Sequence, residues 1–513
     1  MNSVRLRNKL DDLLNPIVVK ELRQAVKSRI VMAALMLFLV VQLAILLLSL
    51  WWSIDNRRPV QMVDLQLGRE LFPWLQGILL GTCLLLVPAY AGIRLAAEHS
   101  DTNVDLLFIS TLRPRGIIAG KLQASIVLIL LIFSACAPFM TFTYLLRGID
   151  IPTILLVLAM DFLLVLLGTQ TAIFLGTVPA NWTLKLLLGV GLGVLLVTIF
   201  GFATVIGDDL RRGLSAVPDP VAFWLVAGAS ALATATATGL LFTWAVAIVS
   251  PPSCNRALPV RLYLLGFWLV TGGMAAYLAH YFRGPIPLYL WMDVFAVLLC
   301  VQILTTINER EQWGLRVRRT IPRRAWLRGP AFLLYSGSAG GLLFAVLLLV
   351  LTLALPNFAL AYGSAFFLSP RGGIIVDFRG TNTFCIGMIA LYVFDYCLTA
   401  VWLRNHLLSA YVKATHTWVL ALLLWGLGMA LPWPILFLFQ NENLSQGQVD
   451  PWLRITDPFS TIFTCVERGQ KDVADLSMMF LCFWGATVLL ACLPWMIRQA
   501  ERFRPPEKGS LAV

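Results

Sequence analysis

A few polar side chains lie deep inside apolar stretches of the chain, where they could line a path for an ion or molecule. Asp161 and Gln170 fall in one apolar run, Asp395 falls in the middle of another, and Asp293 lies nearer the end of a third. A charge inside a membrane span costs about 2.5 to 3.5 kcal/mol, so each needs an explanation. Two interpretations stay open for Asp161 and Asp395: a translocation path or proton relay, or a carboxyl that hydrogen-bonds to a neighbouring helix. For Asp293 the structural role is favoured, because this residue lies near the end of its apolar run.

No set of side chains in the sequence is typical of an enzyme. Serine, histidine and acidic residues are too sparse at any one depth for a hydrolytic triad. None of the nine cysteines forms a C-x-x-C pair, and the four histidines lack metal-ligand spacing. The segment from Gly116 to Lys121 has one residue too few between its glycines for a phosphate loop, and Leu122 stands where Ser or Thr must hold magnesium. We expect no catalytic residue, metal or cofactor, and any ATP must be hydrolysed by another chain.

The composition places the chain in a membrane. It is 59% hydrophobic and 13% charged over 513 residues, whereas soluble proteins are about half apolar and about a quarter charged. About twenty apolar residues cross the bilayer. Runs of this kind cover residues 30–52, 72–92, 122–146, 151–178, 183–206, 221–250, 260–282, 286–307, 331–355, 382–403, 415–440 and 476–497. The predicted fold is an all-α polytopic bundle of about twelve spans, in which clustered glycines such as Gly189, Gly191 and Gly193 favour close helix packing.

The positions of Lys and Arg predict the orientation. The net charge is +12, but the basic residues lie in short segments between apolar runs and not in one stripe, so nucleic acid is not an expected partner. With a cytoplasmic amino terminus, about 27 of the 39 basic residues fall on the cytoplasmic side, as membrane insertion favours. We therefore expect a multi-pass protein of the cell (inner or plasma) membrane of a bacterium, with both termini cytoplasmic.

The segment of residues 93–121 lies between two apolar runs and is too polar to belong to either. Thr102 and Asp105 have the spacing of a capping box, which favours a short helix, and Pro114 is expected to end it. A helix of about eight residues is about 12 Å long, too short to cross a bilayer. The sequence therefore predicts a short cytoplasmic helix with an apolar stripe to bury.

This segment resembles part of a known transporter family. Its residues follow the order Glu98, Asp105-Leu106-Leu107, Ser110-Thr111, Arg113-Pro114-Arg115 and Gly120-Lys121. That order is similar to the permease subunits of type-2 ATP-binding-cassette exporters, in which the loop between the second and third spans is the coupling helix that docks onto the ATPase. The sequence departs from the family pattern at Asp101-Thr102, where Gly-Thr is common, and at Leu112 and Arg113, which separate Thr111 from the proline.

The resemblance implies a set of ATPase-docking residues. They are Glu98, Asp105, Leu107, Phe108, Arg113 and Arg115. The amino-terminal segment NPIVVKELRQAVKSR is similar to the connecting helix of the same family: Asn15 caps it, Pro16 opens it, and Val18, Leu22 and Ala25 form one face opposite the basic residues. Such a helix is expected along the cytoplasmic membrane surface. A generic positive anchor that only fixes orientation stays open as an alternative.

The densest basic segment covers residues 308–330. One interpretation is a topology anchor on anionic lipid, with about 1 kcal/mol for each Lys or Arg near the surface. In the other interpretation, the segment repeats residues 93–121. When Thr320 is aligned with Thr111, a glycine follows nine residues later in both segments, at Gly329 and Gly120. That spacing favours a duplication of a six-span half.

Four regions follow from these features. They are a connecting helix (1–29), a first six-span half (30–250) with the coupling loop 93–121, a second six-span half (251–497) with the basic loop 308–330, and an unordered cytoplasmic tail (498–513). The function expected from the resemblance is the permease of an ATP-driven exporter that works with a separate ATPase. The permease could act as a homodimer, together with a partner permease, or as a single chain. The alternatives are a secondary transporter driven by protons through Asp161 and Asp395, and a non-transporting membrane scaffold.

Overall fold

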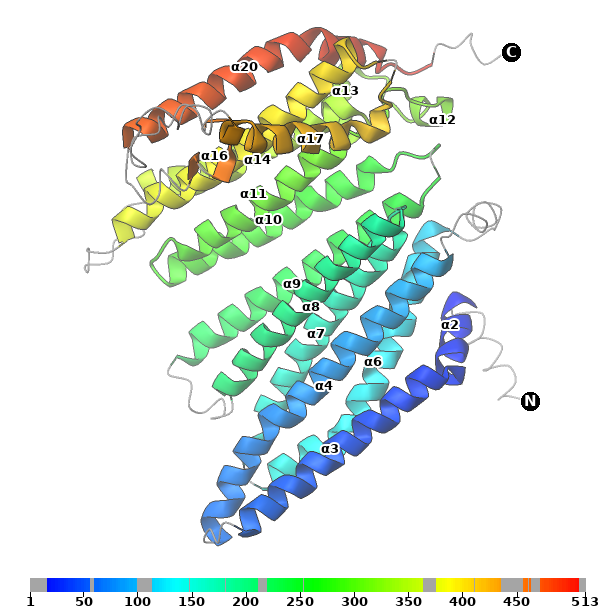
Figure 1. The fold of residues 1–513 in the computed structure, drawn as a ribbon, viewed down its shortest axis with the longest axis vertical. Helices are drawn as coiled ribbons and strands as arrows, with labels where there is room; N and C mark the ends of the chain where they lie inside the picture. The colour runs from blue at the N-terminus through cyan, green and yellow to red at the C-terminus, as the bar shows by residue number, and fades with distance from the viewer. Residues whose placement is uncertain are drawn as a thin grey trace. The chain divides into compact units, whose positions relative to one another are not determined.

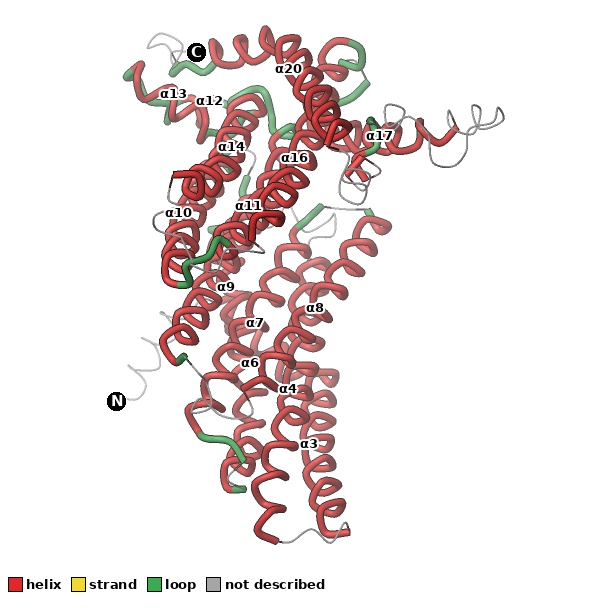
Figure 2. The backbone as a smooth tube through the Cα atoms, turned by 90° about the vertical axis from the view of Figure 1, so that its left-hand side faces the viewer, coloured by secondary structure: helices red, strands yellow, loops and turns green. Residues whose placement is uncertain are grey.

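The computed structural model describes residues 16–55, 60–98, 113–146, 148–179, 181–210, 219–251, 253–362, 375–409, 411–434, 455–459, 461–462 and 471–506. All regular structure in those residues is helical (Figure 2). Twelve of the described helices are long and apolar enough to cross a membrane. The predicted fold class, an all-α protein with twelve spans, is confirmed.

The chain divides into two compact units, Met1–Pro251 and Pro252–Val513. The candidate spans of the first unit are Arg29–Trp52, Leu67–Ala97, Pro114–Leu145, Ile151–Thr177, Thr183–Leu210 and Pro220–Val249. Those of the second unit are Ala257–Tyr281, Ile286–Thr306, Ser338–Phe358, Phe384–His406, Ala414–Pro434 and Asp475–Arg502. Each unit thus holds six candidate spans among the described residues, while the duplication of a six-span half stays a prediction.

The first unit is built around α7 (Figure 1). Its helices are α2 (Pro16–Lys27), α3 (Arg29–Asp55), α4 (Val60–Glu98), α6 (Pro114–Leu145), α7 (Ile151–Thr177), α8 (Trp182–Leu210) and α9 (Pro220–Val249). Helix α7 packs against α4, α6, α8 and α9. Side chains of α4 and α6 fill the core, with Phe72, Leu79, Ile129 and Ile132 fully buried. Since a helix satisfies its own backbone hydrogen bonds, such an arrangement suits a lipid environment.

Local chemistry sets where these helices begin and where they approach closely. Asp150 and Asp219 are N-caps whose carboxylates accept from backbone N–H groups of the first turn, and a proline follows each in that turn. Gly68 of α4 faces Gly148 in the turn before α7, where an added Cβ would lie 2.8 Å from the Gly148 Cα. Only glycine fits at that crossing, which Arg69 supports by donating from Nε to the Gly148 carbonyl at 3.2 Å.

The second unit is centred on α11 and α16. Its elements are α10 (Ala257–Tyr281), α11 (Ile286–Thr306), α12 (Leu315–Arg318), α13 (Ala325–Leu334), α14 (Ser338–Tyr362), α16 (Ile375–His406), the short 3-10 helix η2 (Ala414–His416), α17 (Thr417–Ala430) and α20 (Lys471–Arg502). Helix α11 packs against α10, α14 and α16, and α16 packs against α17 and α20. The basic segment 308–330 contains α12 and the start of α13.

Two acidic residues attach this basic segment to the helices of its unit. Arg261 of α10 is fully buried and lies 2.6 Å from both carboxylate oxygens of Glu309. Gly337 also donates its N–H to Glu309 at 2.6 Å, and the Leu333 carbonyl accepts from Arg261 at 2.9 Å. The Glu309 carboxylate therefore joins α10 to the chain between α13 and α14.

Glu311 makes the second attachment. Its carboxylate forms an ion pair with Arg404 of α16 and accepts from Trp495 Nε1 of α20 at 3.0 Å. Arg404 also donates to Thr417 Oγ1 of α17 at 2.9 Å. The segment that the sequence presents as a basic loop is thus held by ion pairs to two helices, α10 through Glu309 and α16 through Glu311, and by a hydrogen bond from Glu311 to α20.

Two boundaries of the prediction are wrong in this unit. The span predicted for residues 331–355 starts at Ser338, because α13 stops at Leu334 and the Arg261 guanidinium occupies the carbonyls of Leu333 and Tyr335. The tail predicted as unordered from residue 498 continues α20 to Arg502, and Phe503 is buried. Its ring packs edge-on against the rings of Trp313, Phe332 and Tyr335. Residues 498–506 therefore belong to the packed unit.

Two expectations for the first unit also need correction. The third span, predicted from position 122, begins eight residues earlier at Pro114, which occupies the first position of α6 with Arg113 as the N-cap residue. Proline suits that position because its missing N–H has no helical partner there. Gly189, Gly191 and Gly193 have no atom within 4 Å of an added Cβ, so they do not mediate close packing within the described chain.

Candidate functional site

Helix α2 is joined to α4 and α6 by one buried acidic residue, Glu21. The buried positions of α2 are Val18, Glu21 and Ala25, which lie three and four residues apart and share one face. The basic residues Lys20 and Arg23 lie on the exposed side. Glu21 is only 5% exposed, so its carboxylate needs partners from the protein.

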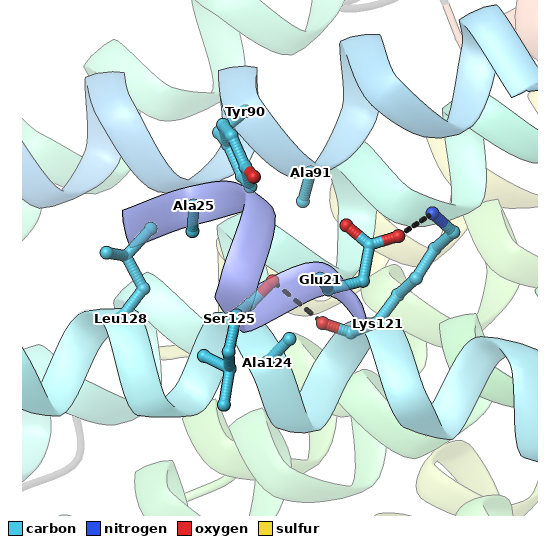
Figure 3. Close-up of a pocket in the computed structure, with 9 residues that line it drawn as sticks. Glu21, Ala25, Tyr90, Ala91, Lys121, Ala124, Ser125 and Leu128 are labelled. Atoms are coloured by element: carbon cyan, nitrogen blue, oxygen red, sulfur yellow. Dashed lines mark hydrogen bonds and ion pairs between the residues drawn. The ribbon is translucent and has the colours of Figure 1, made fainter. Parts of the chain in front are cut away.

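Two cations from different helices meet the Glu21 carboxylate. Lys121 Nζ of α6 lies 2.7 Å from Glu21 Oε1, and both side chains are buried (Figure 3). Arg94 Nη1 of α4 lies 3.6 Å from Glu21 Oε2. Ser125, one turn beyond Lys121, donates to the Lys121 carbonyl at 2.9 Å. We name Glu21, Arg94 and Lys121 the α2 joint.

Arg94 makes a second connection between α2 and α4. Its Nη1 donates to Gln24 Oε1 at 2.6 Å and to Tyr90 Oη at 2.8 Å. The guanidinium carbon lies 4.9 Å from the centre of the Tyr90 ring, a distance at which a cation is attracted to the aromatic face. Charge, hydrogen bonds and ring contact therefore all fix Arg94 against α2.

The α2 joint lies at both ends of the segment predicted to be the coupling loop. Arg94 is four residues before the end of α4 at Glu98, and Lys121 is seven residues after the start of α6 at Pro114. The one acidic residue of α2 thus binds the two helices that lead into and out of residues 99–112. Glu21 thereby links the end of α4 to the start of α6.

The joint is suited to holding helices together and not to binding a substrate. The cavity beside Glu21 and Lys121 measures about 10 Å³, room for at most one water molecule. Removing one partner from a buried ion pair leaves an uncompensated charge and costs about 3 to 5 kcal/mol. The geometry therefore favours a mechanical connection that breaks only at considerable cost.

The predicted ATPase-docking residues fall into three groups. Asp105, Leu107 and Phe108 lie outside the described residues. Glu98 is the last residue of α4, and its side chain is also outside the description. Arg113 and Arg115 are exposed at the start of α6, where a partner chain can reach them.

Asp161 and Gln170 do not share a surface of α7. Asp161 is buried and accepts hydrogen bonds on both oxygens from Gln76 Nε2 of α4, at 3.2 and 3.1 Å. Gln170 is fully buried, and neither atom of its amide has a hydrogen-bond partner in the described part of the chain. Nine residues separate the two, about 2.5 helical turns, which places them on opposite sides of the helix. A path lined by both would have to pass around α7.

Asp395 belongs to the second unit and differs from Asp161 in its surroundings. It is fully buried in α16, and neither carboxylate oxygen has a hydrogen-bond partner among the residues that the structure describes. An added Cβ at Gly485 of α20 would collide with its Oδ1. The carboxyl group is thus enclosed between α16 and α20 without the amide donor that Asp161 has.

Sequence reasoning missed the α2 joint, although one signal was available. Glu21 lies three residues after Val18 and four before Ala25, which puts an acid on the apolar face of a basic helix. The prediction gave that face to Leu22, which is half-buried and lines the same small cavity. An acid at an apolar position indicates a buried cationic partner, but its identity needs the fold.

The described part of the chain shows no metal or disulfide chemistry beside the joint. The described residues contain no group of three or more His, Cys, Asp or Glu side chains placed to hold a metal ion. The eight cysteines within them are free.

Comparisons with protein-family models, with curated proteins and with solved structures found no match for this chain.

Proposed function

We propose that the chain is the membrane-spanning permease subunit of an ATP-driven exporter, energised by a separate ATPase that docks at residues 93–121. The observation that carries the proposal is the α2 joint, in which Glu21 binds Arg94 and Lys121 on the two helices that flank this segment. The resemblance of the segment to the coupling helix of type-2 exporters supports the same assignment.

The joint suggests how a force at the segment reaches the spans. A push on residues 99–112 acts on α4 and α6 together, since Glu21 holds both. Helix α4 packs against α7, the central helix of the unit, so tilting α4 and α6 changes the packing on α7. Closure of the ATPase would in this way shift the bundle between its inward-open and outward-open states.

Co-purification tests the docking surface. The chain is co-expressed with the ATPase from an adjacent reading frame that carries a phosphate loop, and the complex is isolated through a tag on the ATPase. We expect Phe108→Asp and the double variant R113E/R115E each to lose most of the complex, because they place acidic charge on the proposed contact. Arg23→Glu is the matched control, an exposed basic residue of α2. Complex yields that stay equal in all of these variants would contradict the placement of the contact.

A proton-coupled secondary transporter is the second candidate, and one observation favours it. The Asp395 carboxyl is buried inside a span without a hydrogen-bond partner in the described residues, as a proton-carrying group can be. That function requires transport to survive ATP depletion, to collapse with an uncoupler, and to be lost in Asp395→Asn. Transport that stops on ATP depletion and persists with the uncoupler supports the exporter instead.

A further inference from the structure

A groove of about 730 Å³ runs between α3 and α4, beside the α2 joint. Residues 28–41 line one wall, and residues 78–94 line the other. The two helices lie side by side, and α2 turns away from α3 at the Ser28 end (Figure 1). The groove therefore opens along the flank of the first unit, next to the start of α3.

The walls of the groove have the polarity and length of one lipid leaflet. Ile30, Leu37, Leu85 and Ile93 line it and are between 65% and 76% exposed. Residues 28–41 rise about 20 Å along a helix. This is close to the thickness of one leaflet, which is half of a hydrocarbon core of about 30 Å together with one interfacial layer. Thr82 is the one polar side chain of the lining away from the Ser28 end. The long wall thus suits acyl chains.

The polar atoms of the groove gather at one end. Ser28 and Arg94 lie there, where the span of α3 begins at Arg29 and the span of α4 ends at Ala97. Arg94 keeps about a third of its side chain exposed, although it binds Gln24 and Tyr90. Lys27 and Arg29 precede and follow Ser28 in the chain and are exposed, although neither is part of the lining of the groove.

The chain beside that end of the groove carries an excess of basic residues. Residues 16–29 carry four basic side chains, Lys20, Arg23, Lys27 and Arg29, against the single acid Glu21. The Glu21 carboxylate is buried, 2.7 Å from Lys121 and 3.6 Å from Arg94. A cationic end on an apolar groove that begins at the end of a span is complementary to an anionic head group with its acyl chains.

We propose that this groove binds one anionic phospholipid. The phosphate lies at Ser28 and Arg94 between Lys27 and Arg29, and the acyl chains lie along α3 and α4 between Ile30 and Leu85. Because Gln24 and Tyr90 hold Arg94, the bound lipid also rigidifies the connection of α2 to α4. The site does not depend on the proposed transport function.

Thermal unfolding of the full chain in detergent tests the proposal. The probes are dioleoyl phosphatidylglycerol, dioleoyl phosphatidylcholine and soluble glycerol 3-phosphate. We expect phosphatidylglycerol to raise the midpoint by several degrees at a concentration about tenfold below that needed for phosphatidylcholine. Glycerol 3-phosphate should have no effect, since it lacks the chains that fill the groove. Native mass spectrometry should show one retained phosphatidylglycerol per chain.

Two variants separate the head-group end from the apolar wall. K27Q/R29Q should remove the preference for phosphatidylglycerol over phosphatidylcholine. R316Q/R319Q is the matched control, because it removes two exposed arginines of the second unit and should keep the preference. Ala89→Phe fills the groove from α4 and should weaken both lipids. If Ala89→Phe fails to fold, lipid retention by K27Q/R29Q still decides the matter.

Three outcomes would overturn the proposal. Equal effects of the two lipids on the wild-type chain would mean that the groove takes any lipid. Loss of the preference in R316Q/R319Q, but not in K27Q/R29Q, would place the anionic site elsewhere. A lipid-insensitive dimer that dissociates in Ala89→Phe would assign the groove to a second copy of the chain.

Discussion

The described ion pairs beside the segment between the second and third spans differ in the two units. In the first unit, one acid of α2, Glu21, binds two cations on the helices that flank residues 99–112. In the second unit, the acids Glu309 and Glu311 belong to the segment itself and each binds its own arginine. The acid lies outside the segment in the first unit and inside it in the second.

This difference bears on both the duplication and the mechanism. The described ion pairs differ between the units: an acid of α2 pairs with a base of α6 in the first, whereas an acid of the segment itself pairs with a base of α10 in the second. The second segment is fastened at two points, to α10 and to α16, whereas the helices around the first share a single carboxylate. A carboxylate shared by two helices can move with both of them, which fits the proposed transmission of force through α4 and α6.

The largest effect is expected at Glu309. Glu309→Ala leaves the fully buried Arg261 guanidinium without its carboxylate and should lower the free energy of unfolding by about 3 to 5 kcal/mol. Chemical unfolding of the detergent-solubilised chain measures the change. Arg316→Ala, at an exposed position of the same segment, should stay within about 0.5 kcal/mol. If Glu309→Ala lowers the free energy of unfolding no more than the control does, the carbonyls around Arg261 suffice to stabilise its buried charge.

A smaller loss is expected at Glu21. Glu21→Ala removes the carboxylate that lies 2.7 Å from the buried Lys121, but Arg94 keeps Gln24 and Tyr90, so we expect a loss of about 3 kcal/mol, the lower end of the range for a broken buried pair. Arg23→Ala on the exposed face of α2 is the control. The exchanged pair E21K/K121E should recover part of the loss, since the ion pair can form again. A greater loss at Glu21 than at Glu309 would reverse the comparison of the two units.

The sequence predicted what depends on neighbouring residues. All twelve spans were found because hydropathy over about twenty residues decides whether a segment crosses a membrane. The break between α13 and α14 was missed because it depends on Arg261, more than seventy residues away in the chain. The α2 joint was missed for the same reason, since Glu21 and Lys121 are one hundred residues apart. Side-chain partners across such separations follow from the packing and not from the local pattern.

The two intramembrane aspartates give the next comparison. Asp161→Asn leaves one acceptor oxygen in place of the two that accept from Gln76, so it should cost about 1 to 1.5 kcal/mol. Asp395→Asn keeps the shape of a group that has no hydrogen-bond partner within the described structure, so its stability should change by less than about 1 kcal/mol. Parallel unfolding curves of the two variants measure both changes. If Asp395→Asn abolishes transport without changing stability, the result would support the proton-coupled secondary transporter.

The smallest effect is expected on α8, where two glycines stand in opposite surroundings. Gly191 is exposed with no atom near an added Cβ, so Gly191→Ala should raise stability by about 0.5 to 1 kcal/mol, because alanine loses less backbone freedom in a helix. Gly207→Ala should lower it, since the new Cβ overlaps the Gln76 amide that binds Asp161. Chemical unfolding measures the stability of both variants, and the molecular mass of the detergent complex reports their oligomeric state. A Gly191→Ala variant that loses stability and dissociates a dimer would show that this face of α8 packs against a second copy, which a single chain leaves uncovered.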